Sequence, residues 1–290
     1  MNITHMASYA QDFLTLDSKK LILDFTLKHL MLDGGFKGRG GSSDIYYTFF
    51  GVQLLSILSV KSIPDKTVEY IDSIKKPEKY DIIHLTCFLR IKNVLNNLKT
   101  IQNNPLQYHL LEKFRSHAGG FCIDKQDQQC SVYASFLAYL TYMECNIVLS
   151  YDPKQMIKCI EKFKSEDGAY AEIANMHTGT LTVTCATVIL LFSMTGVIDE
   201  VAVAWIIDRQ AETGGFFASK DAFIPDLVSS ASAVFCLNYI NQKQYINDNI
   251  LDFVESLMKE NGGFSGSSHD SIPDIEYTFY SLLTIGSFMF

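Results

Sequence analysis

The chain contains 290 residues with a mass of 32.7 kDa, and its 24 basic and 32 acidic side chains give a formal net charge of −8. This acidic balance argues against a nucleic-acid-binding protein, which needs a basic surface. Apolar residues make up 48% and charged residues 19% of the chain, so the composition excludes a disordered protein and allows a large buried core.

The N-terminus and the cysteines indicate the cellular compartment. The first residues contain no basic segment followed by an apolar stretch, and the seven cysteines lack Cys-x-x-Cys spacing. Both features favour a cytoplasmic protein without a secretory signal. The uncharged segment 178–198 is long enough to cross a bilayer. Its six threonines favour a buried helix instead, so we predict no transmembrane segment.

A short glycine motif recurs along the chain at a nearly constant spacing. It pairs glycine with a following aromatic residue at Gly34-Gly35-Phe36, Gly119-Gly120-Phe121, Asp167-Gly168-Ala169-Tyr170, Gly214-Gly215-Phe216 and Gly262-Gly263-Phe264. The starts differ by 85, 48, 47 and 48 residues, and 85 is close to two periods. A degenerate repeat is therefore expected between the first two motifs, with its loop near residues 75–79. A fixed period of roughly 40 to 50 residues indicates a repeat architecture.

Each repeat is predicted to contain an amphipathic helix, the glycine loop and an apolar helix. The amphipathic helices are expected at residues 18–32, 64–74, 105–116, 153–164, 199–211 and 248–260. The apolar helices are expected at residues 45–59, 80–94, 130–145, 180–194, 227–240 and 275–288. Helices that are apolar all round must be buried. The alternation therefore predicts an all-α fold, a single α/α toroid over residues 1–290 with inner and outer rings of six helices.

An aspartate precedes three of the apolar helices, ten or twelve residues after the first glycine of its loop. These residues are Asp44, Asp226 and Asp274. An aspartate at this place can cap the helix that follows. In a closed ring the three caps would all lie at one end of the barrel, which also makes them candidate catalytic residues.

Glycine–glycine–aromatic loops followed by an aspartate and an apolar helix resemble the prenyltransferase and squalene-cyclase repeat superfamily. The C-terminal half is most similar to the β subunit of protein geranylgeranyl and farnesyl transferases, whose last two repeats match Pro225-Asp226 and Pro273-Asp274 in order and spacing. The resemblance implies a funnel lined by aromatic residues that holds a prenyl diphosphate, with a zinc ion that activates a thiol. It also implies a helical protein partner, the α subunit.

The zinc ligands of that family are only partly retained. Asp226 matches the family's aspartate, but Val228 stands at the cysteine position and Tyr277 at the histidine position. The first repeat has Tyr47 at the place equivalent to Tyr277. A zinc site of this kind needs three protein ligands. We therefore predict no catalytic zinc and leave magnesium open as a counter-ion of the diphosphate.

Four basic residues are candidates for binding the diphosphate. The resemblance assigns His177, in a His-x-Gly segment before the fourth apolar helix, to the lipid diphosphate, and only Lys220 remains near the family's basic residues in the next loop. The first glycine loop holds Lys37 and Arg39 among glycines and hydroxyl groups, which is typical of an anion site. Tyr47 and Tyr277 are counted as substrate-binding residues beside them.

Three functions remain open from the sequence. The first is an isoprenoid-diphosphate-utilising enzyme of the prenyltransferase type. The second is a terpene-cyclase-like enzyme in which Asp44, Asp226 or Asp274 is kept neutral by burial and protonates an alkene. It ranks second because the chain lacks the clustered Asp-x-Asp-Asp of the superfamily's cyclases. The third is a toroid that binds a lipid or a protein without catalysis.

Overall fold

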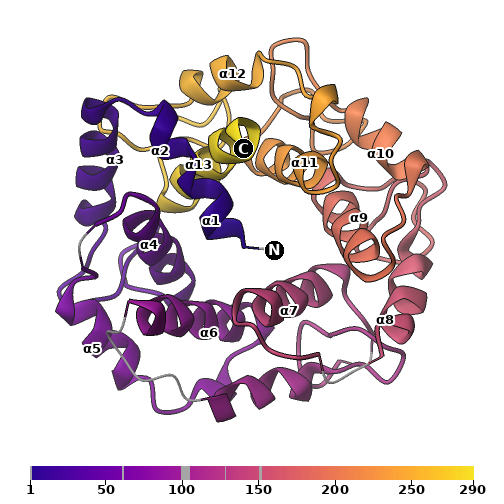
Figure 1. Ribbon diagram of the computed structural model, residues 1–290, viewed down its shortest axis with the longest axis horizontal. Helices are drawn as coiled ribbons and strands as arrows, with labels where there is room; N and C mark the ends of the chain where they lie inside the picture. Colours follow the sequence, from indigo (N-terminus) through magenta and orange to yellow (C-terminus); the bar gives the residue numbers. More distant parts are fainter. Residues whose placement is uncertain (1, 61, 99–104, 128, 150–151) are drawn as a thin grey trace.

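The computed structural model describes residues 2–60, 62–98, 105–127, 129–149 and 152–290. Two concentric rings of helices surround a central axis (Figure 1). The inner ring consists of α4 (Ile45–Ile57), α6 (Ile82–Asn97), α7 (Val132–Glu144), α9 (Leu181–Thr195), α11 (Leu227–Tyr239) and α13 (Ile275–Met289). The outer ring consists of α3 (Leu16–Lys28), α5 (Asp65–Ser73), η2 (Pro105–Phe114), α8 (Pro153–Ile160), α10 (Glu200–Ile207) and α12 (Ile250–Ser256). The predicted α/α toroid is confirmed.

The outer helices are shorter than the sequence pattern suggests, and after α3, α10 and α12 the glycine motif explains why. The residues after α3 leave the helix because Leu30 forms a β-bridge with the motif residue Phe36, which also pairs with Asp44. The same double bridge forms around Phe216 and Phe264. The third outer element, η2, is a 3-10 helix where an α-helix was expected. Short 3-10 segments also occur at η1 (Pro77–Lys79), η3 (Glu161–Phe163) and η4 (Lys243–Tyr245).

The aromatic residue of each glycine motif connects its loop to the next inner helix. All five are buried, and each donates its backbone N–H at 2.9–3.1 Å to a hydroxyl in the first turn of the next inner helix, namely that of Thr48, Ser135, Thr184, Ser230 or Thr278. Each hydroxyl lies four residues after the helix cap. In the repeat that contains α5 and α6 the cap is Asp81 and the fourth residue is Leu85, which cannot accept this bond. This is the degenerate repeat expected between the first two motifs.

The glycine motifs also close the ring. Gly34 has a φ of +93°, and a Cβ there would lie 1.9 Å from the carbonyl oxygen of Lys66 in the next outer helix, α5. Gly262, in the last motif, has a φ of +89° and approaches the Leu21 backbone in α3 within 2.3 Å in the same sense. Since only glycine tolerates both the conformation and the close approach, the last repeat docks on the first by the contact that joins its predecessors.

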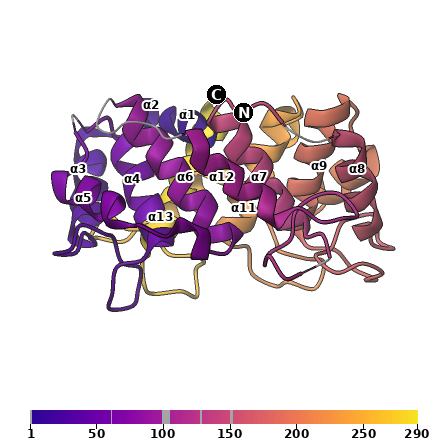
Figure 2. The ribbon, with the colours of Figure 1, turned by 90° about the horizontal axis from the view of Figure 1, so that it is seen from below.

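The two ends of the barrel differ. The loops that follow the glycine motifs project from one end, and both chain termini lie at the other (Figure 2). Two short helices that the sequence analysis did not predict, α1 (Ile3–Ser8) and α2 (Ala10–Phe13), lie at the end with the termini and pack on α13. Gly286 allows this packing, because a Cβ there would lie 2.3 Å from the Met6 carbonyl oxygen. No helix within the described ranges is both long enough and apolar enough to cross a membrane.

Candidate functional site

The inner helices enclose a cavity of about 550 Å³. Its walls are mainly apolar, and the aromatic side chains that line it come from α4, α7, α11 and α13: Tyr46, Phe49, Phe50, Tyr133, Phe136, Phe235, Phe279 and Tyr280. The volume lies within the range of roughly 300–1,000 Å³ that small-molecule sites occupy. Aromatic faces attract positive charge through their quadrupoles. The cavity is therefore suited to an extended apolar ligand and to a developing cation.

A buried ion pair lies where this cavity approaches the end with the termini. Arg90 of α6 donates from Nε to Glu144 Oε2 at 2.7 Å and from Nη2 to Oε1 at 3.1 Å. The two side chains are 6% and 5% exposed. The Ile3 N–H also donates to Glu144, at 3.1 Å, which ties α1 to the pair. Arg90 lines both the central cavity and a polar cavity of about 360 Å³, so this pair stands between the two spaces.

The three aspartates predicted from the sequence cap inner helices at the loop end. Asp44 accepts the Tyr46 N–H at 2.6 Å, and Asp274 accepts the Glu276 N–H at 2.8 Å. Asp226 accepts both the N–H and the hydroxyl of Ser229. None of the three is among the described residues that line the central cavity. The structure thus gives them a capping role and brings none of them against the space where a ligand chain would lie.

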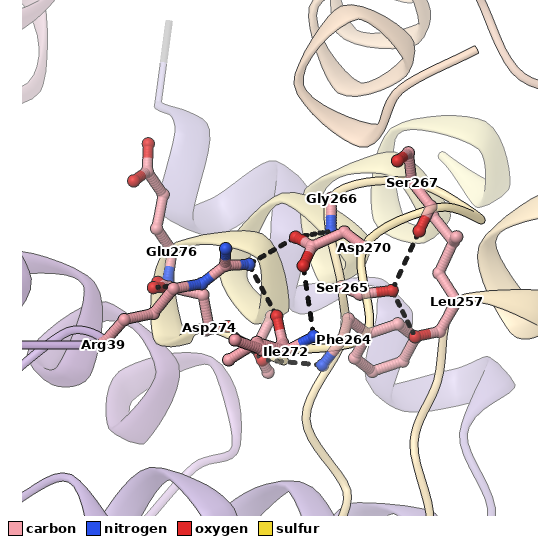
Figure 3. Close-up of polar contacts among 11 residues, drawn as sticks. Arg39, Leu257, Phe264, Ser265, Gly266, Ser267, Asp270, Ile272, Asp274 and Glu276 are labelled. Carbon is pink, nitrogen blue, oxygen red and sulfur yellow. Dashed lines mark hydrogen bonds and ion pairs between the residues drawn. The ribbon is translucent and has the colours of Figure 1, made fainter. Parts of the chain in front are cut away.

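Arg39 joins the first loop to the last (Figure 3). Its Nη2 donates to the Asp270 carboxylate and, at 2.5 Å, to the Ile272 carbonyl oxygen, and its Nε lies 3.4 Å from Asp274 Oδ2. The guanidinium also lies 5.2 Å from the centre of the Tyr277 ring. Burial by itself would raise the pKa of Asp270, but the hydrogen bond and charge of Arg39 lower it. The charge of Arg39 is therefore already shared by two carboxylates.

The remaining basic candidates lie outside the cavity. The side chain of His177 is 82% exposed, and its Nδ1 lies 2.8 Å from Glu166 Oε2. Lys220 is exposed and Lys37 is partly buried in the first loop. Within the described ranges no acidic side chain forms an ion pair with Lys37. Lys37 is thus the cation of the first loop whose charge is not neutralised by a neighbour.

Tyr47 and Tyr277 occupy equivalent places in the first and last repeats. Each ring lies beneath a loop glycine, since a Cβ at Gly38 would be 2.2 Å from the Tyr47 ring and one at Gly266 would be 2.7 Å from the Tyr277 ring. Neither tyrosine is among the described residues that line the cavity. They support the loops of the mouth, by which we mean the loop end of the barrel.

Two glutamates that the sequence analysis did not select do line the cavity. Glu276, in the first turn of α13, accepts a hydrogen bond of 2.6 Å from the Tyr46 hydroxyl. Burial raises the pKa of Glu276; the Tyr46 hydrogen bond opposes this shift and the charge of Asp274 adds to it. The sequence does contain a signal for this residue, because an acidic side chain in an otherwise apolar helix is costly to bury unless it has a hydrogen-bond partner.

Glu172 lies in the loop that follows the motif aromatic of the fourth repeat. Its carboxylate accepts hydrogen bonds from the Ser131 hydroxyl and, at 3.4 Å, from the Tyr133 N–H. Burial raises the pKa of Glu172 as well, while these two hydrogen bonds oppose the shift. The loop end of the cavity therefore carries two carboxyl groups, that of the half-buried Glu276 and that of the more exposed Glu172.

The residues at the family's zinc positions do not fit a zinc ion. The Asp226 carboxylate accepts hydrogen bonds from Ser229. Val228 lines the cavity with an aliphatic side chain that cannot bind a metal, and the Tyr277 ring packs against Arg39. Within the part of the chain that the structure describes, no three His, Cys, Asp or Glu side chains are grouped so that they could hold a metal ion. We therefore derive no chemical step through zinc.

The family model of the prenyltransferase alpha-alpha toroid domain matches residues 4–88, 78–236 and 190–288. The chain belongs to this family. No curated protein matches the sequence.

Three solved structures illustrate the range of proteins that share the fold. Protein geranylgeranyltransferase-I of Candida albicans, complexed with GGPP, is 15% identical with a TM-score of 0.65, covering 96% of this chain and 88% of that chain. The type II terpene cyclase MstE from Scytonema, as a variant in complex with geranylgeranyl dihydroxybenzoate, is 12% identical with a TM-score of 0.61, covering 98% and 97%. An alpha-amylase from Clostridium perfringens is 14% identical with a TM-score of 0.63, covering 94% and 97%. At these identities the likeness shows the toroid alone, so the function of this member has to be argued from its own cavity.

Proposed function

We propose that this protein is an isoprenoid-utilising enzyme that holds a prenyl chain in the central cavity. The observation that carries the proposal is the cavity itself, with aromatic side chains from four of the inner helices and a volume of about 550 Å³. Membership of the prenyltransferase toroid family supports it. So do the geranylgeranyl ligands named for two structures of the same fold, those of geranylgeranyltransferase-I and MstE.

A prenyl diphosphate is the proposed substrate, and its binding residues stay a prediction. Among His177, Lys220, Lys37 and Arg39, we give first place to Lys37, because it stands in a loop at the mouth without an acidic partner in the described ranges. The reaction is proposed to proceed without zinc, and magnesium carried by the diphosphate is a further source of positive charge. A helical protein partner and a cytoplasmic location also stay predictions.

Calorimetric titration tests the proposal. Farnesyl and geranylgeranyl diphosphate are titrated into metal-stripped protein, with the corresponding free alcohols as controls for the contribution of the diphosphate. We expect saturable binding of a diphosphate, weakened about tenfold, or about 1.4 kcal/mol, by Lys37→Ala. The matched control is Lys28→Ala on the outer helix α3, which should leave the affinity unchanged. If neither the diphosphates nor the alcohols bind, the central cavity is not an isoprenoid site and the proposal is wrong.

A further inference from the structure

The floor of the central cavity, its end on the side of the chain termini, is less apolar than its walls. Arg90 is the one basic side chain among the described residues that line the cavity, and Ile3 of α1 lines it as well. Figure 1 shows α1 reaching from α13 towards the centre of the ring. Arg90 lies about 13 Å along α6 from its cap Asp81 at the loop end, at a rise of about 1.5 Å per residue. A ligand chain that enters at the mouth therefore extends towards a guanidinium group.

The Arg90 guanidinium has more hydrogen-bond donors than the protein uses. A guanidinium carries five N–H groups, and Arg90 donates one from Nε and one from Nη2, both to Glu144. No other described residue accepts a hydrogen bond from Arg90. The guanidinium also lies 4.3 Å from the centre of the Phe49 ring, which belongs to the cavity wall. A ligand in the cavity can therefore offer an acceptor to a donor that the protein leaves over.

The charges at the floor favour an acceptor without charge of its own. Glu144 neutralises Arg90, and its carboxylate also accepts the Ile3 N–H at 3.1 Å. A ligand carboxylate at this place would bury a second negative charge beside that of Glu144, which is costly. The oxygen of a hydroxyl or carbonyl group accepts a hydrogen bond from Arg90 without this cost.

An unmodified prenyl tail would be better served by an apolar floor. Replacing both members of a buried ion pair by apolar residues is often neutral or stabilising, so the stability of the fold does not by itself require the pair of Arg90 and Glu144. A hydrocarbon tail packed against Arg90 would also displace water from its remaining N–H groups and give them no acceptor. An oxygen atom at the end of the chain removes this penalty.

We propose that the floor recognises an uncharged oxygen atom at the far end of the ligand chain. The substrate is then an isoprenoid with a hydroxyl or carbonyl group at its ω-end, and Arg90 donates to that oxygen while Glu144 holds the guanidinium in place. The inference rests on the proposed function, because it takes the chain to lie in the central cavity with its head group at the mouth. Arg90 acts here as a specificity-determining residue and takes part in no bond-making step.

Binding measurements with matched pairs of ligands test this inference. The intact protein is titrated calorimetrically with ω-hydroxygeranylgeraniol and geranylgeraniol, and with ω-hydroxyfarnesol and farnesol, so that each pair differs by one oxygen atom at the far end. We expect at least one hydroxylated ligand to bind about tenfold more tightly than its parent alcohol, the usual effect of a hydrogen bond to a charged group. Equal affinities within both pairs, or tighter binding of both parents, would overturn the inference.

The double variant Arg90→Met with Glu144→Leu tests the role of Arg90 itself. It removes the donors and leaves no unpaired charge, and circular dichroism checks its fold. We expect it to bind the parent alcohols at least as tightly as the unaltered protein and to lose the preference for the hydroxylated ligands. The matched control makes the same exchanges at exposed positions, Lys158→Met with Glu161→Leu, and should keep the preference. A preference that survives in the double variant would refute the role of Arg90.

Two further arms keep the outcomes distinguishable. If the double variant does not fold, Arg90→Lys keeps a charge beside Glu144 without the planar fork of donors, and it should weaken the preference. If the parent alcohols bind but the hydroxylated ligands bind no more tightly, the oxygen site is refuted while the proposed function stands. If none of the four alcohols binds, and neither diphosphate does, both are refuted.

Discussion

Breaking the buried pair of Arg90 and Glu144 should strongly destabilise the toroid. In Glu144→Leu the Arg90 guanidinium loses both acceptors while it stays buried, and the Ile3 N–H loses its partner. An uncompensated buried charge costs about 3–5 kcal/mol. We expect Glu144→Leu to lower the free energy of unfolding by that amount, and Arg90→Met to lower it less, because Glu144 keeps the Ile3 N–H.

The double variant distinguishes a coupled pair from two separate packing effects. With Arg90→Met and Glu144→Leu together no charge is left unpaired, so the loss should be smaller than that of Glu144→Leu alone. Urea unfolding followed by circular dichroism measures all three variants. Glu166→Gln, which removes an exposed ion pair with His177, is the control and should cost less than about 1 kcal/mol. Additive losses in the double variant, or a loss below about 1 kcal/mol for Glu144→Leu, would refute the reasoning.

Three further predictions concern ring closure, pH and metal content. Gly262→Ala should lower the unfolding free energy by more than about 1 kcal/mol, because its Cβ would strike the Leu21 backbone, whereas Gly40→Ala meets no atom within 4 Å and serves as the control. Equal losses in urea unfolding would contradict this. Burial alone would raise the pKa of Asp199, but hydrogen bonds from Lys164 and Tyr170 lower it. Ionised Asp199 therefore stabilises the folded protein above the unfolded pKa of about 3.9, and this contribution is lost as the pH falls through the lower folded pKa. Thermal melts at pH 2–7 should show a smaller acid-induced loss in Asp199→Asn, and parallel curves would exclude this contribution. Elemental analysis should find zinc well below one equivalent, and tightly bound equimolar zinc would overturn our interpretation of the zinc positions.

Much of the architecture could be predicted because its signals are local. The glycine motif, the cap and the apolar run recur within each repeat, and each of these patterns determines the structure of its own few residues. Of the two roles considered for Asp44, Asp226 and Asp274, helix capping and catalysis, the structure shows the capping role. The helices α1 and α2 stand outside the repeat, and no periodic pattern marks them.

The candidate site was harder to predict because its contacts join distant repeats. Arg39 was expected to offer its charge to a diphosphate, yet the closed ring places it beside Asp270, 231 residues away. The place of Glu276 at the cavity could not be predicted, because its hydrogen-bond partner Tyr46 is 230 residues away in sequence. Neither pairing is visible in the spacing within a repeat.

The sequence by itself determined the number of repeats, the alternation of outer and inner helices and the toroid, because periodic burial and capping act within one repeat. The tertiary structure alone decided which polar groups face the cavity and which are neutralised at its mouth. Ring closure brings the first and last repeats together, and the charge state of a carboxyl group depends on the neighbours and burial that this closure creates.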